Sequence, residues 1–223
     1  MIPKIIWQTH ENKYEYLLPF QKNATNTWKN LNPGWEYRYV NAEQRYLEVK
    51  EYSDLVFNYY IKADNIHQAD IWRYITIYKY GGFYADLDSI CTQSIDDSLL
   101  KSYKGEELVC STIGHQHYGV NNSNFGAIKG SKIIKLMLDS LSIKYKNMRI
   151  DDIPLLEFGI PENRLFSSVA IENKDLICFN NDYFMHSSDF KKIFNENIDI
   201  TFNGEKTNYG SLCKTMNWPI YYI

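Results

Sequence analysis

The sequence predicts one α/β domain in which helices cover a central sheet of mostly parallel strands. Strand-like and helix-like segments alternate along the chain, which is the pattern of such sheets. No repeat, low-complexity tract or Pro/Gly-rich linker divides the 223 residues. A chain of this length can bury most of the surface that its unfolded form exposes. We therefore expect a single domain spanning residues 1–223.

The first sixty residues carry two strand patterns and two helical patterns. The first strand is rich in β-branched residues and begins beside Pro3, a residue that strands tolerate at an edge or at their start. Asn32-Pro33-Gly34 is a turn sequence and ends the first helical region. The predicted elements are a strand at 2–9, a helix at 12–31, a strand at 35–40 and a helical region at 42–62.

The next segment predicts a helix over 64–80 followed directly by a strand over 83–90. Apolar residues of the helix recur at i, i+3, i+4 and i+7, Asp64 can cap its start, and Gly81 can end it. Alternation in the strand places Phe83, Ala85 and Leu87 on one face and Tyr84, Asp86 and Asp88 on the other.

Later segments complete the α/β pattern. We expect strands at 106–113, 123–128 and 176–184, and helices at 130–147 and near Pro161. A loop-rich tail follows these elements.

Composition limits the classes of partner. The net charge of −3 and the lack of a basic stripe argue against a nucleic-acid partner. The four cysteines form no Cys-x-x-Cys pair, which favours free thiols in a reducing compartment. No signal-peptide pattern or long apolar run occurs, so we expect a cytoplasmic protein without a transmembrane segment, although a membrane-peripheral role remains open.

Asp86-Leu87-Asp88 is the strongest metal-binding candidate. Two carboxylates two residues apart on a strand point to the same side, where they repel each other unless a cation lies between them. Mg²⁺ or Mn²⁺ takes such oxygen ligands and keeps positions open for phosphates. The alternative is a pair of solvated acids in a turn.

Asp70 and Arg73 lie one turn apart on the helix that leads into this strand. They can form an ordinary surface ion pair, which contributes little to stability. If they face the same site as Asp86 and Asp88, Arg73 can bind a pyrophosphate or a sugar hydroxyl, and Asp70 can accept hydrogen bonds from sugar hydroxyls.

These residues form part of a longer pattern that resembles the Asp-x-Asp, sugar-binding-region glycosyltransferases. That grouping includes initiating α-1,6-mannosyltransferases, inositol-phosphoceramide mannosyltransferases and capsular-polysaccharide transferases. The segments that carry the resemblance are Ile2-Pro3-Lys4-Ile5-Ile6-Trp7-Gln8-Thr9, Asn32-Pro33-Gly34-Trp35-Glu36-Tyr37 and Ala69-Asp70-x-x-Arg73-Tyr74-x-x-x-Tyr78-x-x-Gly81-Gly82-x-Tyr84-x-Asp86-x-Asp88. Beyond residue 90 it thins to Asn124-Phe125-Gly126-Ala127.

The resemblance implies a GT-A fold, a nucleotide-diphosphate sugar donor and a Mn²⁺ or Mg²⁺ ion. By position, Asp70 and Arg73 hold the transferred sugar with Tyr84 nearby. Asp88 binds the metal, and Asp86 binds the ribose, the sugar or the metal through water. Trp7 either stacks on the donor base or belongs to the core of the first strand. Relatives often carry a third, histidine ligand, for which His186 is the nearest match, although Ser187-Ser188-Asp189 departs from their pattern.

The expected function is the transfer of a hexose to a glycan, lipid or protein hydroxyl, with retention of configuration, as in polysaccharide biosynthesis. We expect a UDP-sugar as donor, with GDP-mannose as the second choice. Two alternatives remain open: a metal-dependent nucleotidyltransferase or phosphohydrolase, and a catalytically silent module that binds a nucleotide sugar. The segment 157–161 departs from the pattern of relatives and leaves the acceptor contacts open.

Overall fold

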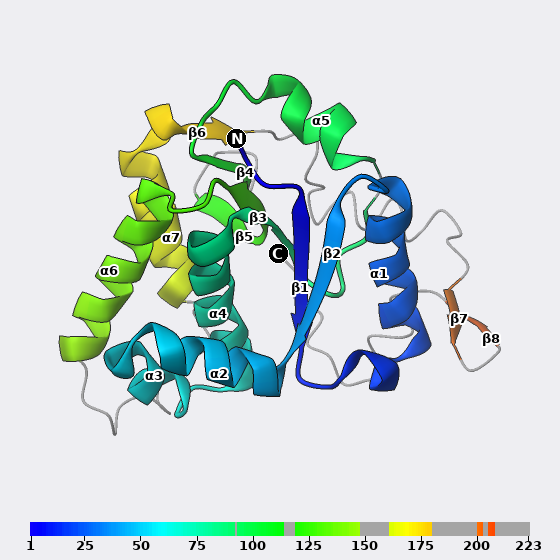
Figure 1. The fold of residues 1–223 in the computed structure, drawn as a ribbon, viewed down its shortest axis with the longest axis horizontal. Helices are drawn as coiled ribbons and strands as arrows, with labels where there is room; N and C mark the ends of the chain where they lie inside the picture. Colours follow the sequence, from blue (N-terminus) through cyan, green and yellow to red (C-terminus); the bar gives the residue numbers. More distant parts are fainter. Residues whose placement is uncertain (92, 114–118, 148–160, 180–199, 203–204, 208–223) are drawn as a thin grey trace.

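A computed structural model describes residues 1–91, 93–113, 119–147, 161–179, 200–202 and 205–207. Its centre is a six-stranded sheet in the order β2-β1-β3-β5-β4-β6, and a separate pair, β7 and β8, lies apart from it (Figure 1). The strands are β1 (Ile5–His10), β2 (Glu36–Asn41), β3 (Gly82–Ala85), β4 (Leu108–Ile113), β5 (Gly119–Ala127), β6 (Ile177–Phe179), β7 (Ile200–Phe202) and β8 (Glu205–Thr207).

The central sheet is mostly parallel, as the sequence predicts. β1 runs parallel to β2 and β3, and β4 runs parallel to β6. Only β5 is reversed, because it pairs antiparallel with both β3 and β4. Residues 114–118 alone separate β4 from β5, a connection too short for a parallel crossover, so β5 has to run back along β4.

Helices cover the two faces of the sheet. Figure 1 shows α4, α6 and α7 on one side and α1 on the other. The helical segments are η1 (Tyr14–Tyr16), α1 (Pro19–Leu31), α2 (Ala42–Tyr52), α3 (Asp54–Tyr60), α4 (Asn65–Tyr80), α5 (Ile95–Ser102), α6 (Lys132–Asn147), α7 (Pro161–Glu172) and η3 (Lys174–Leu176). Within the described part of the chain, no helix has both the length and the apolar character needed to cross a bilayer.

Strand alternation separates two hydrophobic cores. Trp7, Tyr84 and Phe125 face the core under α4, α6 and α7, whereas Ile6 and Phe83 face the core under α1. Neighbouring residues of one strand therefore serve opposite faces of the sheet, as the period of two requires.

The connection from α4 to β3 fixes where the Asp-x-Asp motif lies. Asp64 caps α4 by accepting hydrogen bonds from the backbone N–H groups of Ile66 and His67, each at 3.0 Å, as the sequence predicts. Gly81 ends the helix with φ of +70°, and a Cβ atom there would lie 2.7 Å from the backbone nitrogen of Lys129. Glycine therefore permits a tight passage from helix to buried strand.

Four predicted elements need correction, one of them the strand predicted over 123–128, which begins at Gly119 as β5. The helical region 12–31 contains η1 and α1, and the region 42–62 contains α2 and α3, which are separated at Ser53. The strand predicted over 83–90 ends at Ala85, because the Ser89 N–H donates to the Asp86 carbonyl at 3.0 Å and closes a turn. The Asp-x-Asp motif therefore lies in a turn after β3 rather than on the strand. Residues 180–184 of the last predicted strand lie outside the described residues.

Candidate active site

The structure brings Asp70 and Arg73 of α4 together with Asp86 in the turn after β3. One terminal nitrogen of Arg73, Nη2, lies 2.8 Å from Asp70 Oδ1 and 3.1 Å from Asp86 Oδ1. The two carboxylates therefore share one guanidinium. The sequence prediction that the helix pair faces the Asp-x-Asp motif is correct for Asp86.

The Asp70–Arg73 pair is buried, which rules out the alternative of a surface ion pair. Asp70 is 3% exposed and Arg73 is 5% exposed. Burial opposes the charge of Arg73, but the two neighbouring carboxylates outweigh this effect and raise its pKa. Arg73 is therefore a permanent positive charge held inside the protein.

Asn122 on β5 completes the surroundings of this pair. Its backbone carbonyl accepts a hydrogen bond of 2.6 Å from Arg73 Nη1, and its side-chain Nδ2 donates to Asp70 Oδ1 at 3.4 Å. The sequence interpretation missed Asn122, since its strongest contact is made by a backbone carbonyl, which every residue type possesses.

Tyr84 and Arg73 together fix the orientation of Asp86. The Tyr84 hydroxyl donates to Asp86 Oδ1 at 2.6 Å, and the Arg73 guanidinium lies 4.4 Å from the centre of the Tyr84 ring. Burial and the neighbouring Asp86 charge raise the pKa of Tyr84 well above its usual value, so this hydroxyl stays protonated and remains a donor. Both contacts use the same carboxylate oxygen, which leaves Asp86 Oδ2 without a protein hydrogen bond among the described residues.

Asp88 differs from Asp86 because it has an exposed side chain and no ion-pair partner in the described part of the chain. It nevertheless lies among many protein atoms. The resulting loss of hydration, together with the Asp86 charge, raises the pKa of Asp88 to about 6. The carboxylate is accessible and is destabilised by its neighbour, so a nearby cation would stabilise it.

The donor set fits a hard divalent cation. Asp86 Oδ2 and the Asp88 carboxylate are oxygen ligands of the kind that Mg²⁺ and Mn²⁺ prefer, and their mutual repulsion is relieved by a cation. Within the described ranges, no cluster of three or more His, Cys, Asp or Glu residues is placed to hold a metal. His186, the predicted third ligand, lies outside those ranges and stays a prediction.

Trp7 occupies the core rather than an open surface. It is 4% exposed, and its indole Nε1 donates to the Gly81 carbonyl at 2.9 Å. The Tyr80 ring stacks on it at 5.5 Å, and the Arg38 guanidinium lies 4.9 Å from its centre. Of the two interpretations left open by the sequence, this arrangement favours the core position over stacking on a donor base.

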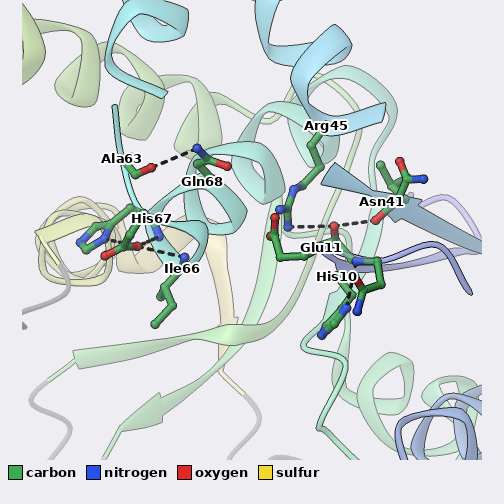
Figure 2. A network of polar contacts seen from close by, with 12 residues as sticks. His10, Glu11, Asn41, Arg45, Ala63, Ile66, His67 and Gln68 are labelled. Atoms are coloured by element: carbon green, nitrogen blue, oxygen red, sulfur yellow. Dashed lines mark hydrogen bonds and ion pairs between the residues drawn. The ribbon is translucent and has the colours of Figure 1, made fainter. Parts of the chain in front are cut away.

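A second polar network, which the sequence interpretation also missed, lies at the carboxyl ends of β1 and β2 (Figure 2). Arg45 of α2 is 1% exposed; it pairs with Glu11 and donates to Thr9 Oγ1 at 3.2 Å. His10 lies beside Glu11, and burial lowers the pKa of His10. The network includes the last residues of β1, which pair with β2.

Comparison with known structures defines the class of fold. The structure aligns with the ligand-free glycosyltransferase domain of the YGT toxin with a TM-score of 0.56, over 84% of this chain and 82% of that one, at 7% sequence identity. The fold is of the GT-A glycosyltransferase type, as the resemblance predicts.

Comparison of sequences finds a family match over a segment that contains Asp70, Arg73, Asp86 and Asp88. Residues 20–106 match the family described as the glycosyltransferase sugar-binding region containing the DXD motif, and the resemblance is confirmed over this segment. The chain is 33% identical over 102 residues to inositol phosphoceramide mannosyltransferase 3 of Schizosaccharomyces pombe, which covers 44% of this chain and 27% of the relative. It is 30% identical over 110 residues to an initiation-specific alpha-1,6-mannosyltransferase of Candida albicans, covering 45% and 28%. The chain thus spans about a quarter of the length of these relatives.

Proposed function

We propose that this chain is a metal-dependent glycosyltransferase that moves a hexose from a nucleoside-diphosphate sugar to a hydroxyl of a glycan, lipid or protein. One observation carries the proposal: the buried Asp70–Arg73 pair contacts Asp86 directly, next to the accessible carboxylate of Asp88. A nucleotidyltransferase or phosphohydrolase needs paired acids but has no need for this buried pair. The match of residues 20–106 to a sugar-binding region supports the same choice.

Asp86 and Asp88 are the proposed metal-holding residues. A bound Mn²⁺ or Mg²⁺ would neutralise the negative charge that develops on the departing diphosphate. Asp86 offers Oδ2, because Oδ1 is already held by Tyr84 and Arg73. Asp88 offers its whole carboxylate, which makes it the principal ligand of the two.

Arg73 supplies a fixed positive charge beside the transferred group. Three acceptors hold its guanidinium: the Asp70 and Asp86 carboxylates and the Asn122 carbonyl. Because these contacts are made by groups of the protein itself, the charge is held in place by the fold and needs little reorganisation during the reaction. Arg73 Nε is buried and makes no hydrogen bond within the described residues, so it is a donor that a sugar hydroxyl or phosphate oxygen can satisfy.

Asp70 is the proposed acceptor of hydrogen bonds from sugar hydroxyls. Its Oδ1 lies 2.8 Å from Arg73 Nη2, and an opposite charge at this distance favours a carboxylate, which can accept such bonds. Besides the site carboxylates, no acidic side chain in the described ranges contacts Arg73, and we place no enzyme nucleophile in the mechanism. This is compatible with retention of configuration, which we keep as part of the proposal.

Two nucleotide sugars are candidates for the donor substrate. A UDP-hexose is our first choice and GDP-mannose the second, whereas both relatives compared above are named mannosyltransferases, which supports mannose as the sugar. We therefore propose that UDP-glucose, UDP-galactose and GDP-mannose be compared directly, each with Mn²⁺ and with chelator.

Thermal unfolding tests the donor, because a ligand that binds only the native state raises the midpoint of unfolding. We expect one donor to raise the midpoint with Mn²⁺ and not with chelator, and we expect sugar release or transfer in the same mixture. Release of inorganic phosphate or pyrophosphate would identify the phosphohydrolase or nucleotidyltransferase alternative. Metal-dependent binding without turnover on any acceptor would identify a silent binding module.

A further inference from the structure

We infer that Gln8 is a positioning residue that holds the Asp-x-Asp turn in its metal-binding geometry through the backbone carbonyl of Asp86. Its importance for catalysis rests on the proposed function, whereas its hold on the turn is a property of the fold. Gln8 lies in the middle of β1 and is 0% exposed. Because the Gln8 side chain is fully buried, it can affect the site only through the residues that it contacts.

The amide of Gln8 bridges two elements. Its Nε2 donates to the Asp86 carbonyl at 3.0 Å, and its Oε1 accepts from the Tyr37 hydroxyl at 2.8 Å. The orientation of the amide is chemically determined, because a carbonyl oxygen only accepts hydrogen bonds and has to face the NH₂ group. Tyr37 on β2 then satisfies the other end of the amide.

Burying this amide is unfavourable unless its hydrogen bonds are made. Gln8 shares the face of β1 with Ile6, which belongs to the apolar core under α1. An apolar side chain of similar size would fill the same space without any need for partners. A glutamine at this position is therefore explained by the two hydrogen bonds that it makes rather than by the volume that it fills.

The carbonyl that Gln8 holds is the one that closes the turn. The Ser89 N–H donates to the same Asp86 oxygen at 3.0 Å, and the Asp86 N–H donates to the Ser123 carbonyl at 2.8 Å. On the far side of the turn, Trp28 of α1 donates to the Ser89 carbonyl at 2.8 Å. Gln8 is thus the side chain that ties the first peptide of the turn to the rigid centre of the sheet.

The hydrogen bond from Gln8 to the Asp86 carbonyl restrains the directions of the Asp86 and Asp88 carboxylates. Once β3 ends at Ala85, the sheet no longer fixes the directions of the Asp86 and Asp88 side chains. Rotation of the peptide between Asp86 and Leu87 would move both carboxylates relative to each other. Groups that orient metal ligands affect metal affinity although they do not touch the metal.

The test compares Gln8→Leu and Tyr37→Phe with wild type, using Mn²⁺ alone as the probe. Electron paramagnetic resonance measures free Mn²⁺, and hydrogen exchange measures protection of the amides at residues 86–89. Gln68→Leu is the matched control, since the Gln68 amide donates to the Tyr60 and Ala63 carbonyls, each at 3.0 Å, and not to the turn. Figure 2 shows the contact with Ala63.

We expect Gln8→Leu to weaken Mn²⁺ binding by roughly 10–100-fold, the range seen when residues that orient metal ligands are removed. Tyr37→Phe leaves Gln8 in place and should weaken it less, and it serves as the decisive variant if Gln8→Leu does not fold. Exchange at 86–89 should become faster in both variants and stay unchanged in Gln68→Leu.

Two results would overturn the inference: unchanged exchange at 86–89 in both variants, or an equal loss of Mn²⁺ affinity in Gln68→Leu. If wild type binds no Mn²⁺, the proposed function fails, and the exchange measurement still decides whether Gln8 holds the turn.

Discussion

The two halves of the site differ in how completely the protein balances their charges. In the closed half, Asp70, Tyr84 and Asp86 are bonded around the buried guanidinium of Arg73. The open half consists of Asp88, which is exposed and unpaired within the described residues, and whose pKa is raised to about 6. The difference separates the part of the site that folding organises from the part that the proposed metal would complete.

This contrast has an energetic consequence. Removing Asp70 or Arg73 from the closed half leaves a buried charge without compensation, so it should reduce stability as well as function. Removing the charge of Asp88 relieves repulsion, so it should reduce function while leaving or increasing stability. Substitutions in the two halves therefore have opposite expected effects on unfolding.

The largest combined effect should come from Arg73→Ala. The buried Asp70 carboxylate and the partly exposed Asp86 carboxylate then lose their shared cation, and we expect a loss of about 3–5 kcal/mol in the free energy of unfolding, together with loss of turnover. Arg73→Lys should not restore turnover, because an ammonium group cannot reach several acceptors in the way that a planar guanidinium does. Urea denaturation and donor-hydrolysis assays measure both.

Lys135→Ala is the control for Arg73→Ala. Lys135 forms an exposed ion pair with Asp139, and its loss should change stability by less than about 1 kcal/mol. Near wild-type turnover in Arg73→Lys would contradict the role of the planar group and reduce Arg73 to a general source of charge.

Asp88→Asn should lower turnover by orders of magnitude without unfolding the protein. The substitution keeps the shape of the side chain and removes the charge that attracts a cation. We expect Mn²⁺ to strengthen UDP or GDP binding in wild type and to have no effect in the variant, as measured by calorimetry with Mn²⁺ and with chelator. A variant that retains metal-dependent binding and turnover would exclude Asp88 as the principal ligand.

The same substitution has a stability effect with a defined pH dependence. The pKa of Asp88 is raised in the folded protein, so ionisation is less favourable there than in the unfolded chain, and wild-type stability falls as pH rises from about 4 to about 6. Metal-free Asp88→Asn should therefore melt above wild type at pH 7.5, and this difference should disappear near pH 4. A difference that is equal at both pH values would contradict the raised pKa.

A substitution of Trp7, which lies outside both halves of the site, tests whether this residue belongs to the core or stacks on the donor base. The Trp7 ring is buried and packs against Tyr80 and Arg38, so Trp7→Ala should cost about 3–5 kcal/mol of stability as a large core truncation. Nucleotide affinity of the folded fraction should stay close to wild type. A loss of affinity equivalent to about 1–3 kcal/mol, without a comparable loss of stability, would restore the base-stacking interpretation.

Much of this arrangement follows from local sequence patterns. The apolar stripe and caps of α4 place Asp70 and Arg73 one turn apart on a helix that leads directly into β3, and these signals depend on nearby residues only. The parallel pairing of β1 and β3 agrees with the predicted fold class.

Other features depend on tertiary contacts that leave little trace in the sequence. The end of β3 at Ala85 is set by a turn hydrogen bond from Ser89, which the alternation of Phe83, Ala85 and Leu87 does not reveal. Asn122 acts mainly through its backbone, and Gln8 is bonded to a residue 78 positions away. The contact pattern of Trp7 likewise depends on packing against α4 and β2.

Tyr84→Phe should have the smallest effect on stability and Mn²⁺ affinity, and it tests whether Asp86 belongs to the closed half. It removes one hydrogen bond to Asp86 Oδ1 and keeps the ring against which the Arg73 guanidinium packs. Arg73 still holds the same oxygen at 3.1 Å, so we expect a stability loss of about 1 kcal/mol and a Mn²⁺ affinity within about tenfold of wild type. Tyr84 and Arg73 both orient Asp86, so the loss of one contact leaves the carboxylate held by the other. If Tyr84→Phe weakens Mn²⁺ binding as much as Asp88→Asn does, Asp86 belongs to the open half, and its orientation depends on the tyrosine hydroxyl alone.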